Sequence, residues 1–454
     1  MSRASTASEA SLVILNTCTV TSGADQDARA AIRRVRRQNP EAQIVVTGCY
    51  AQRAPEEIAA MPGVSLVVGN SHKHQLAEIA LERTSMAGLA FVPLSDLVPN
   101  DLGATDDRRP IFVSDIFAHT ELLAAPVFDA ANERTRPNLK VQDGCDNRCS
   151  FCVIPYVRGQ SRSLREDRIL TEVRVLVEAG YREVVISGIN LGRWGRDLAI
   201  SHQLSAVSQN GKRRTTSEQR LTSLIRAILA ETGLEKLRVS SVEPMDWSDE
   251  LIALVASSPR IAKHAHVPMQ SGSDAVLRRM HRKYRPWHYR EKIGKIRAAM
   301  ADAAIGADEM VGFPGETDTE FDETRRMIEE LPFTYLHVFT YSARPGTPAA
   351  EMKNQVPVQV ARERNRILRE LAAEKKLAFM RSFVGRTVEA ITLNVAGSDG
   401  DGEFTECLTD NYLKLRLRGR HAANRWVSAA VQDVVDGALA AARLSSGSVP
   451  HLSS

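Results

Sequence analysis

Long apolar runs are missing from this sequence of 454 residues. No segment approaches the roughly 20 consecutive apolar residues that a membrane-spanning helix needs, which excludes a helical membrane protein. The opening stretch, MSRASTASEASLVILN, also lacks the basic start and the long apolar core of a secretory signal peptide. We therefore expect a cytoplasmic protein with no membrane partner. Thiols stay reduced in the cytoplasm.

The sequence also has little net charge and few cysteines. The net charge is only +4, from 59 Lys and Arg against 55 Asp and Glu, which permits a nucleic-acid partner without requiring one. The chain has only six cysteines, yet three of them fall within the segment DGCDNRCSFC. In a reducing compartment, grouped cysteines bind metal more often than they form disulfides.

The order of the apolar segments predicts an α/β fold in several parts. Length and a hydrophobic content of 43% suggest two to four domains. Strand-like segments at 11–16, 43–48 and 64–70 alternate with helical stretches, which indicates a small parallel sheet covered by helices.

A larger alternation of strands and helices begins at residue 137. Its strand candidates are 138–143, 183–190, 236–243, 264–270, 306–313 and 335–341. Six parallel strands are too few for the eight-stranded barrel, so we predict an open, partial (βα)6 barrel. A long basic amphipathic helix follows at 362–383, and short strands after it indicate a small β-barrel.

These patterns divide the chain into four predicted parts. They are an N-terminal α/β domain, a linker, the partial barrel and the C-terminal β-barrel, at residues 1–95, 96–134, 135–375 and 380–445.

Three cysteines form the most informative motif, with the spacing Cys145-x3-Cys149-x2-Cys152 in a loop just beyond the first strand of the partial barrel. A structural zinc site is normally closed by four ligands, and no fourth Cys or His lies nearby in the sequence. Three thiolates on an iron–sulfur cube leave one iron open. A structural metal site or a chance grouping is the alternative.

This spacing resembles the signature of the radical S-adenosylmethionine (SAM) enzymes. The resemblance implies that Cys145, Cys149 and Cys152 are catalytic and hold a [4Fe–4S] cluster, whose open iron chelates the amino and carboxylate groups of SAM. It also implies that an electron from the reduced cluster cleaves SAM to methionine and a 5′-deoxyadenosyl radical.

Further motifs narrow the resemblance. They are NTCTVT (16–21), TGCYAQ (47–52), HVPMQSGSDAVLRRM (266–280), VGFPGET (311–317) and FTYSARPGT (339–347). In this order, and over nearly the whole chain, they resemble the methylthiotransferases, radical SAM enzymes that replace a C–H bond with C–SCH3. The resemblance implies a second iron–sulfur cluster in the N-terminal domain, which supplies or binds the sulfur, and a C-terminal RNA-binding domain of the TRAM type.

Cys18 and Cys49 are the expected ligands of that second cluster. Each follows a predicted strand, so both lie at carboxyl ends of parallel strands, where α/β sheets bind ligands. Two buried structural cysteines are the alternative.

The family holds its second cluster with three cysteines, the first on an earlier strand. This chain starts about ten residues before its first predicted strand, so one β-α unit of roughly 30 residues and its cysteine are absent. We expect either a longer native protein, which we favour because every other motif is intact, or an impaired second cluster. Cys407 is expected to be a small buried hydrophobe.

Small and polar residues at strand ends are the expected SAM contacts. They are Ser187, Gly188, Asn190, Ser241, Glu243, Gln270 and Gly312. Small residues let the backbone approach a ligand, while carboxylates and amides bind hydroxyl and amino groups; for each residue singly, a structural role is the alternative. His264 and His266 have no evident ligand partners and are expected to be structural.

Basic residues alternate along the predicted last strand. Lys414, Arg416, Arg418 and Arg420 should therefore point to one side, which favours an RNA-facing surface.

Three substrates are known in the family: prenylated adenosine in tRNA, threonylcarbamoyladenosine in tRNA, and an aspartate of a ribosomal protein. The forms NTCTVT and GCYAQ most resemble the threonylcarbamoyladenosine enzymes. The resemblance then implies methylthiolation at C2 of that adenosine, next to the anticodon. A second SAM would donate the methyl group, and an electron donor and a sulfur source would be further partners. An RNA-binding protein with a structural cluster and no sulfur transfer is the alternative from another class.

Overall fold

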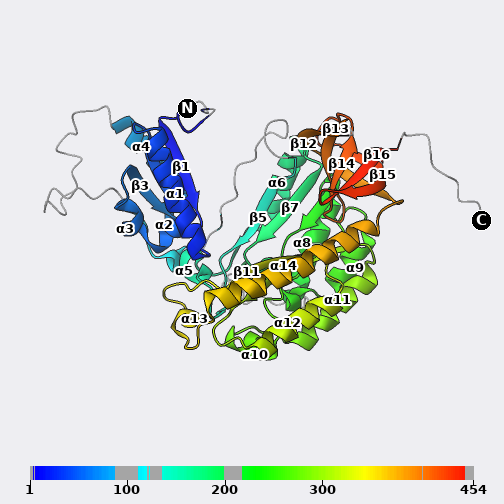
Figure 1. Ribbon diagram of the computed structural model, residues 1–454. Helices are drawn as coiled ribbons and strands as arrows, with labels where there is room; N and C mark the ends of the chain where they lie inside the picture. The colour runs from blue at the N-terminus through cyan, green and yellow to red at the C-terminus, as the bar shows by residue number, and fades with distance from the viewer. Residues whose placement is uncertain are drawn as a thin grey trace, which may run out of the picture. The chain divides into compact units, whose positions relative to one another are not determined.

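The computed structural model describes residues 4, 6–86, 111–119, 122, 135–198, 217–400 and 402–444 (Figure 1). Its contacts divide the chain into two units. Unit 1 comprises Met1–Thr120, Gly144–Gln160 and Ser342–Glu351, and unit 2 comprises Glu121–Asp143, Ser161–Tyr341 and Met352–Ser454. The predicted domain boundaries stay a prediction, and most of the predicted linker lies outside the described residues. Within those residues, no helix is both long and apolar enough to cross a bilayer.

Unit 1 contains the predicted small parallel sheet. Its strands lie in the order β1 (Leu12–Thr17), β2 (Gln43–Gly48), β3 (Val64–Gly69) and β4 (Ile111–Phe112), and all three pairings are parallel. The first three confirm the prediction, whereas the two-residue β4 is too short to leave a sequence pattern. The helical segments of this unit are α1 (Ser22–Gln38), α2 (Cys49–Arg53), α3 (Pro55–Ala59), η1 (Asn70–Gln75), α4 (Leu76–Met86), η3 (Ile116–Ala118), α5 (Ile154–Arg158) and α13 (Pro348–Glu351).

Helix α1 shows why this layer forms. Thr21 caps its N-terminus by accepting a hydrogen bond from the Ala24 amide at 3.1 Å. Apolar residues at helical spacing, including Ile32 and Val35, then face the core, where they meet Ile44 of β2.

Unit 2 contains the predicted partial barrel. Its six parallel strands are β5 (Asn138–Asp143), β7 (Glu183–Gly188), β8 (Lys236–Val239), β9 (His264–His266), β10 (Ala304–Val311) and β11 (Tyr335–Thr340). A parallel bridge between Leu237 and Ile261 joins the β5-β7-β8 sheet to the β9-β10-β11 sheet. The short β6 (Arg162–Ser163) pairs antiparallel with β5 at one edge. The open six-stranded barrel is therefore confirmed.

Helices cover the outside of these strands (Figure 1). They are α6 (Glu166–Glu178), α8 (Ser217–Glu231), α9 (Asp249–Ser257), α10 (Asp274–Arg279), α11 (Pro286–Ala299), α12 (Asp318–Glu330) and α14 (Val358–Arg381), with the short turns η4 (Leu191–Arg193) and η5 (Pro244–Asp246). Helix α14 is the predicted long basic helix, and it packs along β11.

The C-terminal strands of unit 2 close into the predicted small barrel. Its strands are β12 (Thr387–Asp399), β13 (Gly402–Thr409), β14 (Lys414–Arg418), β15 (Trp426–Val435) and β16 (Ala438–Arg443), in the closed order β12-β13-β14-β16-β15. Cys407 is 1% exposed in its core, as expected, and burial raises the pKa of its thiol to about 12.

One detail of that prediction was wrong. Strand β14 is not the last strand, because β15 and the alanine-rich β16 follow it, and Arg420 lies beyond the end of β14. Alternation does hold for Lys414, Arg416 and Arg418, since Leu415 and Leu417 between them lie in the barrel core.

Candidate functional site

The three closely spaced cysteines lie in a loop of unit 1 that closes on itself. The Cys145 amide donates to the Gly159 carbonyl at 3.1 Å, and the Cys152 amide donates to the Cys149 carbonyl at 3.1 Å. Gly144 has φ +71°, and a Cβ there would lie 1.9 Å from the Gln160 carbonyl oxygen. Only glycine fits where the two arms of the loop meet.

The donor set of this loop fits an iron–sulfur cube. All three thiols are partly exposed, and the Asn147 amide points at Cys145 Sγ at 3.4 Å, a contact that stabilises a thiolate. Each thiolate of a cube binds a different iron, so the sulfurs need not converge on one point. The arrangement supplies three ligands and leaves the fourth iron for another molecule.

Cys18 and Cys49 are neighbours at one edge of the unit 1 sheet. The register pairs Thr17, the last residue of β1, with Gly48, the last residue of β2, and a cysteine directly follows each strand. Gly48 has φ +103°, and a Cβ there would lie 2.3 Å from the Thr17 carbonyl oxygen, so the two strand ends approach closely. Cys18 is exposed and Cys49 is buried. The alternative of two buried structural cysteines therefore does not hold for Cys18.

Asn70 connects Cys49 to the three-cysteine loop within unit 1. Its amide nitrogen donates to Cys49 Sγ at 3.4 Å and to the Val157 carbonyl of α5 at 2.8 Å. Cys49 also packs against Val153 and Val157. Two predicted cluster sites that are about a hundred residues apart in the sequence thus belong to one packed unit.

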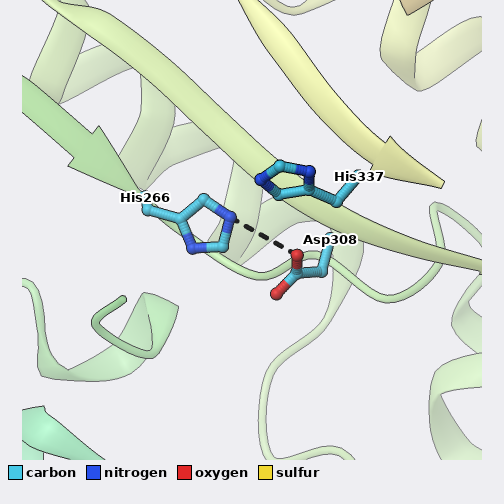
Figure 2. Close-up of side chains that lie close together, drawn as sticks. All are labelled: His266, Asp308 and His337. Atoms are coloured by element: carbon cyan, nitrogen blue, oxygen red, sulfur yellow. Dashed lines mark ion pairs between the residues drawn. The ribbon is translucent and has the colours of Figure 1, made fainter. Parts of the chain in front are cut away.

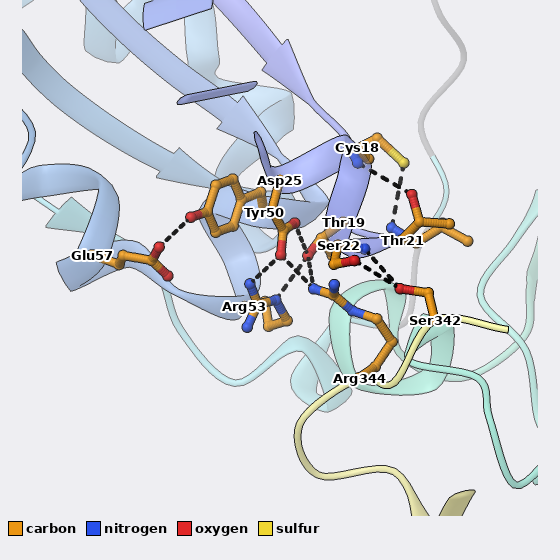
Figure 3. A network of polar contacts seen from close by, with 12 residues as sticks. Cys18, Thr19, Thr21, Ser22, Asp25, Tyr50, Arg53, Glu57, Ser342 and Arg344 are labelled. Atoms are coloured by element: carbon orange, nitrogen blue, oxygen red, sulfur yellow. Dashed lines mark hydrogen bonds and ion pairs between the residues drawn. The ribbon is translucent and has the colours of Figure 1, made fainter. Parts of the chain in front are cut away.

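A buried ion network next to Cys18 was missed by sequence reasoning (Figure 3). The Asp25 carboxylate of α1 accepts from Arg53 at 2.8 Å and from Arg344 at 2.5 Å. Thr19 donates to the same carboxylate at 2.6 Å. Thr19 belongs to the motif NTCTVT, Arg344 belongs to FTYSARPGT, and Arg53 directly follows GCYAQ. The ion network is therefore one reason why these motifs carry a threonine and an arginine at these positions.

The predicted SAM contacts lie at or just beyond the carboxyl ends of the unit 2 strands. Ser187 and Gly188 end β7, Ser241 follows β8, and Gln270 follows β9; Asn190 and Glu243 precede the turns η4 and η5, and Gly312 directly follows β10. Their assignment to SAM remains a prediction.

Several of these residues also have partners in the protein. Ser187 donates to Asn138, and Glu243 forms an ion pair with Arg282. Gly312 has φ +73°, and a Cβ there would lie 2.5 Å from the Ala361 Cβ of α14. Close helix packing therefore explains this glycine without a ligand.

A cavity of about 730 Å³ lies inside the barrel strands of unit 2. Most of its lining residues carry polar groups: they include the predicted contact Ser241, Asp308, two arginines, several histidines and tyrosines, and Asn394 of the C-terminal barrel. Burial lowers the pKa of both His264 and His337, so these imidazoles are neutral near pH 7.

Glu309 carries a carboxylate on the other face of β10. The residue is 0% exposed, and neither oxygen has a hydrogen-bond partner among the described residues. Burial raises its pKa well above the usual value, and the neighbouring Asp308 charge adds to the effect. Glu309 therefore keeps its proton at pH values where an ordinary glutamate has lost it.

The replacement Glu309→Gln should stabilise the protein increasingly as pH rises. At a pH below the pKa of Glu309 in the unfolded chain, the carboxyl is protonated in both states and the parent loses no stability. Between that pKa and the higher pKa in the folded protein, the free energy of unfolding of the parent falls by up to about 1.4 kcal/mol per pH unit. Glutamine does not ionise, so the difference in melting temperature between variant and parent should grow as the pH rises above 5. Glu323→Gln, at an exposed position of α12, should follow the parent. A pH-independent difference for Glu309→Gln would mean that the carboxylate is ionised in the fold.

Two family models match the chain: the Radical SAM superfamily over residues 139–328, and the Uncharacterized protein family UPF0004 over residues 1–69. A relative from Bacillus subtilis (strain 168), threonylcarbamoyladenosine tRNA methylthiotransferase MtaB, is 36% identical over 413 residues, which span 90% of this chain and 82% of the relative. The chain belongs to the radical SAM methylthiotransferase family. It is an enzyme, and membership implies a [4Fe–4S] cluster and SAM.

Other similar proteins agree with this membership. A tRNA-2-methylthio-N(6)-dimethylallyladenosine synthase from Thermobifida fusca (strain YX) is 34% identical over 437 residues, or 95% of this chain and 78% of the relative. Among solved structures, the radical SAM methyltransferase TsrM from Kitasatospora setae covers 75% of this chain and 66% of its own, with a TM-score of 0.53. At 16% identity, that match shows a shared fold alone.

Proposed function

We propose that this methylthiotransferase replaces the C2 hydrogen of N6-threonylcarbamoyladenosine, next to the anticodon of a cytoplasmic tRNA, with a methylthio group. The observation that carries the proposal is the 36% identity over 90% of the chain to a relative named for that substrate. The relative named for dimethylallyladenosine is 34% identical, so prenylated adenosine is the second candidate.

The residues of the chain divide the work. Cys145, Cys149 and Cys152 would hold the radical cluster, which when bound supplies the electron that cleaves SAM and so generates the hydrogen-abstracting radical. The strand-end residues of unit 2 would bind SAM. Cys18 and Cys49 would contribute to a second cluster that supplies or binds the sulfur, and their adjacency at one sheet edge supports this role. A reductant and a sulfur source would come from other molecules.

The small barrel would bind the tRNA backbone, as a TRAM-like domain. Lys414 and Arg418 are its best candidates, because both are exposed on the outer face of β14. Arg416 is less suited, since it is half-buried, and Arg420 lies beyond the end of the strand.

Charge reversal at Lys414 and Arg418 should weaken tRNA binding by roughly tenfold, because two phosphate contacts are lost. The slope of log affinity against log salt concentration should also fall, by about 0.7–0.9 for each contact removed. Fluorescence anisotropy with labelled tRNA over a salt series measures both quantities. The double variant Lys283→Glu/Arg326→Glu makes the same charge change at exposed positions elsewhere in unit 2. Equal weakening in the two double variants would contradict a specific role for β14.

A genetic experiment tests the function itself. Nucleosides of tRNA from cells that lack this gene are analysed by mass spectrometry, with and without a plasmid that encodes the chain. Loss of 2-methylthio-N6-threonylcarbamoyladenosine, restored by the chain and not by its Cys145→Ala/Cys149→Ala/Cys152→Ala variant, supports the proposal. Loss of the prenylated nucleoside instead would favour the second candidate, and no change in either would overturn both.

A further inference from the structure

Three side chains from neighbouring strands of unit 2 converge in the cavity: His266 of β9, Asp308 of β10 and His337 of β11 (Figure 2). Their potential ligand atoms all lie within 4.8 Å of one another. In the part of the chain that the structure describes, no other group of three His, Cys, Asp or Glu side chains meets this condition.

Strand register brings the three together. In the parallel pairing of β10 with β11, Asp308 stands opposite His337. In the pairing of β9 with β10, His266 stands opposite Gly306, and side chains two apart on a strand share a face. Gly306 also matters because a Cβ there would meet the Tyr335 ring at 2.0 Å.

His266 is oriented by a residue behind it. Its Nδ1 lies 2.6 Å from the Ser241 hydroxyl. In the tautomer that donates from Nδ1, the lone pair of Nε2 is directed at the Asp308 carboxylate, 3.4 Å away. Metal-binding histidines typically have such a partner on the second ring nitrogen.

The Nε2 atom of His266 lacks a hydrogen-bond partner among the described residues, although the residue is only 7% exposed. A buried polar atom without a partner costs about 1–3 kcal/mol, so its retention calls for a ligand. Asp308 likewise has no Lys or Arg partner within the described ranges. In the tautomer that donates from Nδ1, His266 Nε2 and the Asp308 carboxylate are both acceptors, so they form no hydrogen bond with each other.

The spacing suits a metal ion. In a tetrahedral site with bonds of about 2.0–2.2 Å, neighbouring ligand atoms lie about 3.3 Å apart, close to the 3.4 Å between His266 Nε2 and Asp308 Oδ1. Two imidazoles and one carboxylate form a set that binds zinc or ferrous iron with an open position. We propose that His266, Asp308 and His337 bind a divalent first-row transition metal, whose open position faces the cavity.

The cavity indicates which ligand this position would take. Arg136 and Arg238 also line the cavity and attract an anionic group, and a divalent cation would neutralise the Asp308 carboxylate that otherwise repels it. The open position therefore suits a carboxylate or hydroxyl oxygen, and the threonyl part of threonylcarbamoyladenosine carries both. This last step rests on the proposed function, whereas the metal site does not.

Zinc retention by the holoenzyme tests the site without tRNA. The protein with its iron–sulfur clusters assembled is given one equivalent of Zn²⁺ under anaerobic conditions, dialysed and analysed for zinc and iron. Zinc K-edge X-ray absorption then identifies the ligand atoms. We expect about one zinc per chain with nitrogen and oxygen ligands only. Zinc that is lost on dialysis, or that shows sulfur neighbours, would overturn the proposal.

Variants localise the metal to these three residues. Asp308→Asn and His337→Gln should each weaken zinc binding by at least about a hundredfold, and Ser241→Ala by roughly tenfold to a hundredfold through the orientation of His266. The matched control is His264→Gln, which changes a histidine of the same strand and cavity outside the set. Unchanged iron content shows that each variant is folded. Equal zinc loss in the control, or full retention in Asp308→Asn, would contradict the assignment.

Discussion

Replacement of Cys149 by alanine should reduce SAM cleavage to background. Cys149 is the middle of three thiols, and a cube held by two thiolates leaves a second iron open and is expected to be lost. Its carbonyl still accepts from the Cys152 amide in the variant, because that bond uses only the backbone, so the loop keeps its shape. The measurement is 5′-deoxyadenosine formed from SAM with dithionite under anaerobic conditions, together with iron content and Mössbauer spectra.

Cys407→Ala is the matched control. That thiol is buried in the small barrel and should contribute nothing to the radical cluster, so SAM cleavage should match that of the parent. If Cys149→Ala still formed 5′-deoxyadenosine at the parent rate, the three-cysteine loop would not hold the radical cluster.

Asp25→Ala should have the largest effect on stability of the changes outside the cysteines. It leaves the guanidinium groups of Arg53 and Arg344 facing each other, and Arg344 is only 2% exposed. Removal of one partner from a buried ion network costs about 3–5 kcal/mol. The segment that carries Arg344 also donates from the Ala349 amide to the Ser150 carbonyl of the three-cysteine loop, at 2.8 Å. We therefore expect both a lower melting temperature and a lower iron content.

Asp27→Ala provides the comparison, because Asp27 lies two residues further along α1 and is exposed. It should change the melting temperature by only a fraction of the shift in Asp25→Ala. Limited proteolysis would show which part of the protein is destabilised, since cleavage of Asp25→Ala should increase in unit 1 before it increases in unit 2. Equal stability of the two variants would show that the network is held together by other contacts.

Local patterns were sufficient to predict much of the fold. Alternating and unbroken apolar segments indicate the strands of both units, and the six strand segments of unit 2 predict the open barrel. The errors lie where a local pattern is weak. Strand β4 has two residues, and β16 is an alanine-rich segment, ALAAAR, whose composition does not favour a strand.

The three-cysteine motif can be recognised in the sequence because its spacing is local, whereas the other clusters of side chains depend on strand register. Cys18 and Cys49 were placed together only by the rule that parallel strands end at one edge, and the pairing of Thr17 with Gly48 supports it. The sequence shows no ligand partner for His266, because Asp308 and His337 come from strands far along the chain. No sequence pattern states that Asp308 stands opposite His337; the parallel register decides it.

The same limit applies to Asp25, Arg53 and Arg344. Arg344 is separated from Asp25 by most of the chain, and the two meet only because Ser342–Glu351 packs within unit 1. From the sequence, Arg344 is simply an arginine before a Pro-Gly turn. A buried charge can be identified only when its partner and its burial are both known.

The most direct test of the proposed function is a single reaction with two substrates. The assembled protein, dithionite, a sulfide source and SAM with a trideuterated methyl group are incubated with tRNA that carries threonylcarbamoyladenosine or, separately, prenylated adenosine. Nucleoside mass spectrometry should show a trideuterated methylthio group on threonylcarbamoyladenosine and little or none on the prenylated nucleoside. Labelled product from the prenylated substrate alone would contradict the proposed substrate. Cleavage of SAM with neither product would contradict sulfur transfer by this chain.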